Sequence, residues 1–419
     1  MKPKVYLMGP LLTRSGYGEQ SRFALRALKT RDDIFDLYVE PLEWGHTSWL
    51  AEDTEEKRYI DFLIEKTAAF LQSGQRPDIS IQCTIPNEWK PQLAAVNIGY
   101  TAGIETTKVA HEWIQAANKM TKVIVVSEHS KKVFENSHYV GTNEATGEKV
   151  ELKTTVPISS VGYPVKNYDE LPELDLSEIK TDFNFLAVAQ WGPRKNIENM
   201  INWYFQEFHD ENVGFVIKTN RAKNSLIDRE YCDGLLKKIA VLHPEAKCKI
   251  YLLHGEMSDE EMHALYVHEK ISAFVAIPHG EGFGLPIFES AYSGLPIVAV
   301  GWSGQVDYLY SDNVANFYEV SYDLRPVQQE SVWDGVIVAD SMWAFAREDS
   351  YKQSMRNCYD DICSNQGIAK KACENAVQLK EKFSDEQMYK KFIDSLQLNI
   401  EELKKSVNWS KEISQIEIL

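Results

Sequence analysis

Short apolar runs alternate with helix-like stretches along almost the whole chain, and this alternation limits the possible folds. It is the pattern that builds parallel sheets covered by helices, so we expect an α/β protein. The strand-like runs of the first half are VYLMG (5–9), ISIQC (79–83), VNIGYT (96–101) and KVIVVS (122–127). Helical patterns lie at 18–30, 54–73, 107–119 and 128–136. A second series of strand-like runs covers 184–190, 213–219, 249–255, 273–278 and 296–301.

A Pro-rich and acidic stretch, VGYPVKNYDELPELD, separates the two series after Val161 and is typical of a linker. The 419 residues, 44% of them hydrophobic, are enough to bury two cores. We therefore expect one domain over residues 1–165, a second over 166–382, and C-terminal helices over 383–419. Turn residues between β-prone flanks predict a hairpin at 140–154. From residue 340 onward the pattern predicts helices only.

Composition excludes several classes of protein. No run of 18 apolar residues is present, and the first residues turn to Gly and Pro too early for a signal peptide, so we expect a cytoplasmic protein. A net charge of −17 disfavours nucleic acid and anionic membrane as main partners. The six cysteines form no CxxC pair, so neither a disulfide framework nor a structural zinc site is indicated.

The stretch PHGEGFGLPIFESAYSGLP follows a strand of the second series, at the sheet edge where α/β folds bind ligands. Pro286 and Gly294 predict a short helix over 286–293, whose first N–H groups form an anion site. Glu289, near the start of that helix, can accept hydrogen bonds from the two hydroxyls of a ribose. Glu281 in the preceding loop faces a second polyol, which suggests a nucleotide sugar. The alternative is a glycine-rich turn with surface glutamates.

Arg194 and Lys195, in WGPRKNIENMI, follow the first strand of the second series. Two adjacent cations at the carboxyl edge of a sheet can neutralise a diphosphate leaving group. Taken alone, such a pair is more typical of a solvated helix start. Together with the glutamate loop, it favours a nucleotide-sugar site.

These residues resemble glycosyltransferase family 4, also called glycosyltransferase group 1, whose retaining enzymes have the GT-B fold of two Rossmann-like domains facing a cleft. EGFGLPIFE with its E-x7-E spacing, the RKN segment, SGLPIVA and LHGEMSDEEMHALY carry the resemblance, and GPLLTRSGYGEQSRFALRAL is similar to the family's N-terminal glycine loop. The resemblance implies a UDP- or GDP-sugar donor, retention at the anomeric carbon, and a last helix that returns to the first domain. The donor-binding residues that it implies are Gly16, Tyr17, Gly18, His254, Gly282, Phe283, Gly284, Leu285 and Glu289.

The acceptor side of the cleft is less defined in the sequence. Glu105, in the loop of NIGYTAGIETTKVAHEW, is the first candidate for a polar group facing the acceptor or donor sugar, and His111 is the second. The alternatives are a helix-capping carboxylate and a surface imidazole. Ser127 is expected to be an N-cap.

No D-x-D triplet occurs in the chain, so we expect a metal-independent transferase in which Arg194, Lys195 and helix N–H groups neutralise the diphosphate. The acceptor, a glycan, a lipid-linked sugar or another hydroxyl compound, is left open. Two other functions remain: a glycosyltransferase that modifies DNA bases, and a non-catalytic carbohydrate-binding or scaffold protein. Arg22, Arg26, Lys29 and Arg31 could form a basic patch for peripheral membrane contact, although a solvated face is the simpler interpretation.

Overall fold

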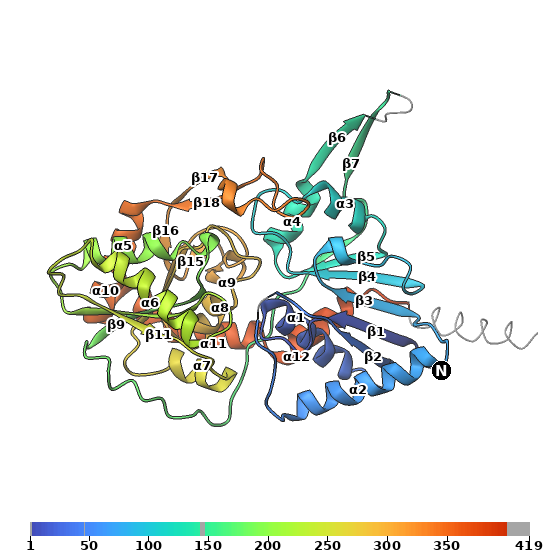
Figure 1. Cartoon of the computed structure of the whole chain (residues 1–419), viewed down its shortest axis with the longest axis horizontal. Helices are drawn as coiled ribbons and strands as arrows, with labels where there is room; N and C mark the ends of the chain where they lie inside the picture. The colour runs from blue at the N-terminus through green and yellow to red at the C-terminus, as the bar shows by residue number, and fades with distance from the viewer. Residues whose placement is uncertain (1, 46, 143–146, 400–419) are drawn as a thin grey trace, which may run out of the picture.

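The structure is a computed structural model that describes residues 2–45, 47–142 and 147–399 (Figure 1). Its first domain holds a parallel sheet of order β2-β1-β3-β4-β5-β8, as the alternation of strands and helices predicts. The strands are β1 (Lys4–Gly9), β2 (Asp36–Pro41), β3 (Ile79–Cys83), β4 (Val96–Thr101), β5 (Lys122–Val125) and β8 (Ile158–Ser160). The helices are α1 (Gly16–Lys29), α2 (Glu55–Gln72), α3 (His111–Ala117) and α4 (Glu128–Asn136), with a short 3-10 turn, η1 (Pro86–Glu88).

The second domain holds another six-stranded parallel sheet, of order β11-β10-β9-β12-β13-β16. Its strands are β9 (Phe183–Gln190), β10 (Val213–Asn220), β11 (Lys249–Leu253), β12 (Ala273–Ala276), β13 (Ile297–Val300) and β16 (Tyr318–Val320). Its helices are α5 (Ile197–Glu207), α6 (Leu226–Ala240), α7 (Asp259–Tyr266), α8 (Leu285–Tyr292), α9 (Val306–Leu309), α10 (Glu348–Ser364) and α11 (Gly367–Lys382). The chain reverses direction across this sheet between β9 and β12, and such a switch point is where open α/β sheets bind ligands.

The expectation of helices only from residue 340 onward is wrong at its start. β17 (Tyr322–Pro326) pairs antiparallel with β18 (Met342–Ala346). The residues MWAFA of β18 have apolar positions that fit a helix as well as a strand, because a five-residue apolar run carries too little periodicity to separate the two. Helix begins only at Glu348.

The β17–β18 ribbon and the loop between its strands, residues 322–346, reach the first domain, and we call them the cross-domain arm. Thr107 N donates to Met342 O at 2.8 Å, and Met342 N donates to Thr107 Oγ1 at 3.0 Å. Val336 of the arm is buried in the apolar cluster that contains Trp89 and Trp113 of the first domain. The arm therefore ties the two domains together beside the loop that carries Glu105.

The hairpin expected at 140–154 is confirmed. β6 (His138–Thr142) pairs antiparallel with β7 (Lys149–Lys153), and the two strands project from the first domain (Figure 1). Residues 143–146 of its turn lie outside the described part of the chain.

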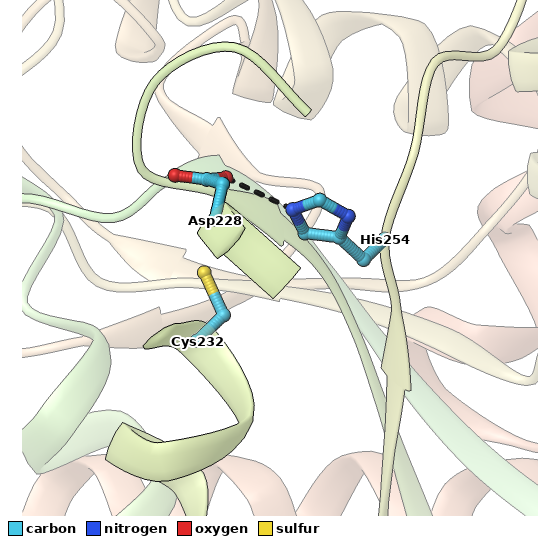
Figure 2. Close-up of side chains that lie close together, drawn as sticks. All are labelled: Asp228, Cys232 and His254. Atoms are coloured by element: carbon cyan, nitrogen blue, oxygen red, sulfur yellow. Dashed lines mark hydrogen bonds and ion pairs between the residues drawn. The ribbon is translucent and has the colours of Figure 1, made fainter. Parts of the chain in front are cut away.

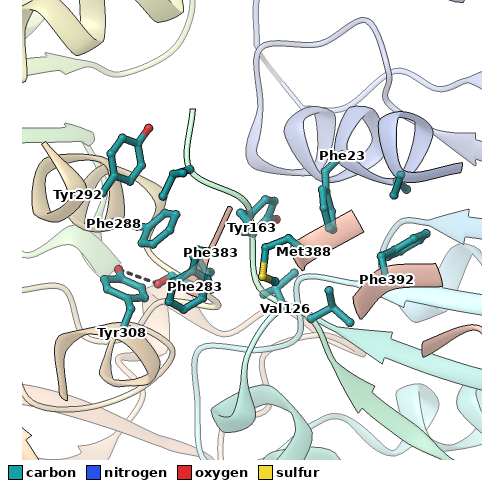
Figure 3. Packing of buried hydrophobic residues seen from close by; sticks show 14 of the residues in the cluster. Phe23, Val126, Tyr163, Phe283, Phe288, Tyr292, Tyr308, Phe383, Met388 and Phe392 are labelled. Carbon is teal, nitrogen blue, oxygen red and sulfur yellow. Dashed lines mark hydrogen bonds between the residues drawn. The ribbon is translucent and has the colours of Figure 1, made fainter. Parts of the chain in front are cut away.

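After α11 the chain reaches the first domain again through α12 (Asp385–Ser395), which packs on α1. The ring of Phe392 meets those of Phe23 and Tyr100 at centroid distances of 5.5 and 5.3 Å. Figure 3 shows this contact and its continuation through Tyr163 toward Phe283 and the second domain, so one apolar core spans the interface. Residues 400–419, the rest of the expected C-terminal helices, lie outside the described residues.

The possible basic patch on α1 is neutralised by carboxylates. Arg22 and Arg26 both pair with Glu19, and Arg26 also pairs with Glu56 at 2.6 Å. Lys29 and Arg31 each have an acidic partner as well. This face therefore offers no concentrated positive charge. Among the described residues, no helix is long and apolar enough to cross a bilayer.

Candidate functional site

Two loops of the second domain meet at its switch point. A 3-10 turn after β9, η2 (Pro193–Lys195), carries Arg194 and Lys195, and Asn196 then adopts a left-handed conformation (φ 54°) that asparagine tolerates well. His279 N, in the loop after β12, donates to Arg194 O at 2.8 Å. This bond holds the cation turn against the glycine loop that carries Glu281.

Arg194, Lys195 and Glu281 form one ion cluster, which also takes in Glu105 of the first domain. Arg194 Nη1 lies 3.0 Å from Glu281 Oε2, and its Nη2 lies 3.5 Å from Glu105 Oε1. Lys195 Nζ pairs with the other oxygen of Glu281. Two cations and two carboxylates from three segments thus meet across the interface between the domains. The two positive and two negative charges balance, so the cluster is electrically neutral without a further counterion.

Burial and charge act in opposite directions in this cluster. Burial favours the neutral acid at Glu281, whose side chain is 10% exposed, but Arg194 and Lys195 outweigh it and hold the pKa of Glu281 below its usual value. Burial lowers the pKa of Lys195, and the carboxylate of Glu281 offsets only part of that effect. The carboxylate of Glu281 is therefore ionised at neutral pH. It pairs with Arg194 and Lys195, the two cations that a bound diphosphate would need.

The glycine loop is in close contact with the first domain. A Cβ on Gly280 would lie 2.2 Å from Glu105 O, and one on Gly282 would lie 2.6 Å from Ala102 O. The sequence suggested that Gly282, which has no side chain, lets a bound ligand approach the backbone closely. In the structure, the backbone of the first domain occupies the space beside it.

Glu289 lies on α8, which begins at Leu285 with Gly284 as a left-handed N-cap (φ 87°). Tyr266 donates its hydroxyl to Glu289 Oε2 at 3.1 Å. Burial raises the pKa of Glu289 to about 7, and of the nearby charges Lys166 opposes the shift while Asp259 adds to it. The carboxyl is therefore poised between its neutral and ionised forms at neutral pH.

Lys166, in the connection between the domains, was not singled out in the sequence. Its ammonium group lies 2.7 Å from Asp259 Oδ2 of the second domain and 3.4 Å from Glu19 Oε2 of the first. It thus bridges the two domains beside Glu289. A single lysine in a Pro-rich linker gives no signal of this role.

The N-terminal glycine loop forms the first turn of α1, which begins at Gly16 rather than near Glu19. Ser15 is its N-cap and accepts from Gly18 N at 2.9 Å. A Cβ on Gly18 would lie 2.1 Å from Thr13 O, whereas Gly16 faces open space. Tyr17 turns its hydroxyl to Thr101 Oγ1 at 2.7 Å, so its side chain supports the end of β4.

Three of the proposed residues lie away from the ion cluster. Phe283 is 4% exposed and packs in the interdomain core, so only its backbone can face a ligand. His111 is half exposed, and its Nδ1 lies 3.1 Å from Glu112 Oε2. His254 is hydrogen bonded to Asp228 at 2.9 Å, beyond the end of β11. Ser127 caps α4, as expected, by accepting from Ser130 N.

Sequence reasoning also missed His129 of α4. Its ring lies edge-on to Trp302 of the second domain, with 4.9 Å between centroids. Burial lowers its pKa to about 4, so it is neutral at physiological pH, and its Nε2 has no hydrogen-bond partner among the described residues. One histidine at a helix start has no spacing pattern that would reveal an interdomain contact.

The space left at the cluster is small. A cavity of about 20 Å³ lies beside Lys195 and Glu281 and is bordered by Pro286 and Ile287. That volume suits a water molecule and excludes a sugar ring.

Comparisons with known proteins identify the fold. No family model matches the chain, and no curated protein matches its sequence. Among solved structures, a glycosyltransferase from Rickettsia africae is similar at 13% identity, covering 99% of this chain and 100% of its own, with a TM-score of 0.57. HepE from Anabaena, in complex with UDP and glucose, gives 13% identity, 94% and 99% coverage, and a TM-score of 0.56. The galactosyltransferase WaaB is 10% identical, with 94% of this chain and 99% of its own chain covered, and its TM-score is 0.55.

The likeness to these structures extends over both domains, since it covers nearly the whole of each chain. Both six-stranded parallel sheets, flanked by helices, match the arrangement in these glycosyltransferases. The chain therefore has the GT-B fold.

Proposed function

We propose that this protein transfers a sugar from a nucleotide-sugar donor to a hydroxyl acceptor, with retention at the anomeric carbon, as enzymes of glycosyltransferase family 4 do. The observation that carries the proposal is the ion cluster of Arg194, Lys195 and Glu281 at the switch point of a GT-B domain. The similar structure of HepE contains UDP and glucose, which supports a donor of this class.

Arg194 and Lys195 would hold the diphosphate of the donor. Negative charge builds on its leaving oxygen as the glycosidic bond breaks, and the two cations lie where they can stabilise that charge. Glu281 would then give up part of its contact with Arg194 and Lys195 and accept hydrogen bonds from hydroxyls of the donor sugar. Glu289 would accept hydrogen bonds from the hydroxyls of the ribose. The leaving oxygen would take the acceptor proton on the same face of the sugar, so no nucleophile from the protein is needed.

Glu105 is the acceptor-side residue that fits this arrangement. It belongs to the first domain and already contacts Arg194 at 3.5 Å. Within the part of the chain that the structure describes, His111 contacts Glu112 and the ring of Tyr139 rather than the ion cluster, so we assign it no role in the reaction.

Donor binding would require the domains to separate from the arrangement described. The cavity beside Lys195 holds about one water, and Ala102 O lies over the position that a Gly282 side chain would take. We infer that opening moves the loop of Glu105 away from the loop of Glu281.

The function is tested by screening nucleotide sugars for thermal stabilisation and then for transfer. A ligand at 100 times its Kd should add about 2.7 kcal/mol to the free energy of unfolding. The stabilising donor is then incubated with pooled oligosaccharides, lipid-linked sugars and hydroxymethylated DNA, and the product linkage is assigned by NMR. We expect a carbohydrate product with the donor's anomeric configuration. Stabilisation by a nucleotide sugar with no transfer or hydrolysis would instead favour a binding protein, and an inverted product would contradict retention.

Glu289 gives the donor site a pH dependence. Its pKa of about 7 means that the ionised fraction rises about tenfold between pH 6 and pH 8. An ionised carboxylate accepts stronger hydrogen bonds than a neutral acid, so donor affinity should rise by up to about tenfold over this range. Calorimetric titration at several pH values measures the effect.

Glu289→Gln should flatten that pH profile and weaken donor binding at pH 8 by about 1.5 to 3 kcal/mol. Glu374→Gln, at an exposed position of α11, is the matched control and should keep the parent profile. The ribose assignment fails if Glu289→Gln binds donor as tightly as the parent.

Metal independence is a further expectation, because the proposed site supplies its own cations. Initial rates in excess EDTA should equal those with added Mg²⁺ or Mn²⁺. Loss of activity in EDTA that Mg²⁺ or Mn²⁺ restores would show that a divalent ion neutralises the diphosphate.

A further inference from the structure

We infer that Asp228, Cys232 and His254 form a binding site for a transition-metal ion of the zinc type. Asp228 and Cys232 lie one turn apart on α6, and His254 follows β11, so the site joins a helix to the sheet edge. Figure 2 shows the imidazole of His254 bonded to Asp228, with the thiol of Cys232 pointing toward Asp228. This site is separate from the ion cluster and does not depend on the proposed function.

The ligand atoms are close enough for one ion. A carboxylate oxygen, Cys232 Sγ and an imidazole nitrogen all lie within 4.8 Å of one another, and His254 Nε2 is 2.9 Å from Asp228 Oδ2. In a tetrahedral zinc site the ligand bonds are about 2.0–2.3 Å, which places ligand atoms about 3.3–3.7 Å apart. The thiol would move inward by about 1 Å and the imidazole would move slightly outward, and both shifts are within the reach of short side chains.

The surroundings of Cys232 fit a ligand better than a packed core thiol. Three other buried cysteines, Cys83, Cys248 and Cys358, belong to apolar clusters of the core. Cys232 is equally buried but belongs to none of the described apolar clusters. It lies instead beside a carboxylate and an imidazole.

The carboxylate is also held as metal ligands commonly are. Asp228 Oδ2 accepts from Arg221 N and Oδ1 accepts from Ala222 N, each at 3.0 Å. Such outer hydrogen bonds orient a ligating carboxylate before the ion arrives.

The donor set points to the class of ion. One sulfur, one nitrogen and one oxygen ligand suit Zn²⁺ and Co²⁺, whereas Mg²⁺ and Ca²⁺ prefer oxygen alone. On binding, the thiol of Cys232 would give its proton to solvent, and His254 would bind as the neutral imidazole that carries its proton on Nδ1, so that a thiolate and the free Nε2 face the ion. The ion would fix the loop before α6 to the end of β11.

Cobalt binding tests the site, because a Co²⁺–thiolate bond absorbs in the near ultraviolet. The background protein is Cys363→Ser/Cys373→Ser, which removes the two exposed thiols and leaves buried ones only. After treatment with a chelator and its removal by dialysis, one equivalent of Co²⁺ should produce the charge-transfer band, and Zn²⁺ should abolish it by displacement. Zn²⁺ should also raise the unfolding temperature of this protein.

Cys232→Ser in the same background should lose the band and the stabilisation by zinc. Cys248→Ser is the matched control, since that thiol lies in an apolar cluster, and it should keep both. Absence of a cobalt–thiolate band from the background protein would overturn the inference without reference to any variant of Cys232. A band that survives Cys232→Ser would also overturn it, and Asp228 would then only hold His254 and its own loop.

Discussion

Replacing Lys195 with alanine is expected to lower kcat by about 10² to 10³ with a smaller change in donor KM. Lys195 lies with Arg194 just after the carboxyl end of β9, where we propose that the diphosphate of the donor would gain charge as the sugar leaves. An interaction made mainly in the transition state affects kcat more than ground-state binding. Steady-state kinetics with the donor found by screening measures both constants.

Lys237→Ala is the matched control for this prediction. Lys237 is an exposed lysine of α6 that pairs with Asp233. Its replacement by alanine therefore changes the net charge by the same amount as Lys195→Ala, but away from the ion cluster. Its kinetics should equal those of the parent. A Lys195→Ala enzyme with unchanged kcat and a raised KM would show that the lysine only docks the donor.

Replacing Glu281 with glutamine is expected to destabilise the ligand-free protein by about 3 kcal/mol. The carboxylate is the shared partner of Arg194 and Lys195, and its removal leaves two largely buried cations with only Glu105 beside them. Glutamine keeps the shape of the side chain, so the change in charge dominates. Chemical denaturation measures the loss in the free energy of unfolding.

The same variant should bind a nucleoside diphosphate more tightly than the parent does, because the carboxylate of Glu281 no longer competes with the diphosphate for the two cations. Glu348→Gln, which removes an exposed partner of Lys352, should change stability by less than about 0.5 kcal/mol and leave nucleotide binding unaltered. If Glu281→Gln is as stable as the parent and binds nucleotide no better, the neutralising role of Glu281 is wrong.

The sequence predicted that Arg194, Lys195 and Glu281 belong to one site, although 86 positions separate Lys195 from Glu281, but it did not predict that they form ion pairs with one another. Both segments follow apolar runs long enough to be recognised as strands, and the carboxyl ends of parallel strands lie on one edge of a sheet. The strand order that makes β9 and β12 neighbours is not visible in local patterns.

Contacts across the domain interface could not be predicted in this way. Glu105 was singled out for its loop, but its pairing with Arg194 depends on how two separate sheets face one another. The interdomain contacts of His129 and Lys166 also depend on how the two domains face one another, and no sequence spacing indicates either contact. The neutralisation of the basic residues of α1 also follows from packing, because Glu56, on α2, is 30 positions from Arg26.

Short strands also limited what could be predicted from the sequence. β18 was predicted as helix, and β2 was not predicted at all, because each has only five or six residues in which to show an alternating pattern. The error at β18 hid the cross-domain arm, whose backbone bonds to Thr107 lie two residues from Glu105. Local sequence could not show that this arm lies beside the loop that carries Glu105.

The central claim is that the ion cluster and Glu289 form a nucleotide-sugar site, and calorimetric titration with UDP, GDP, ADP and TDP tests it most directly. We predict that one of these binds the parent with a stoichiometry of one, that Lys195→Ala and Glu289→Gln each weaken its binding at least about tenfold, and that Lys237→Ala binds as the parent does. The claim is contradicted if none binds at millimolar concentration, or if the one that binds has the same affinity for all four proteins.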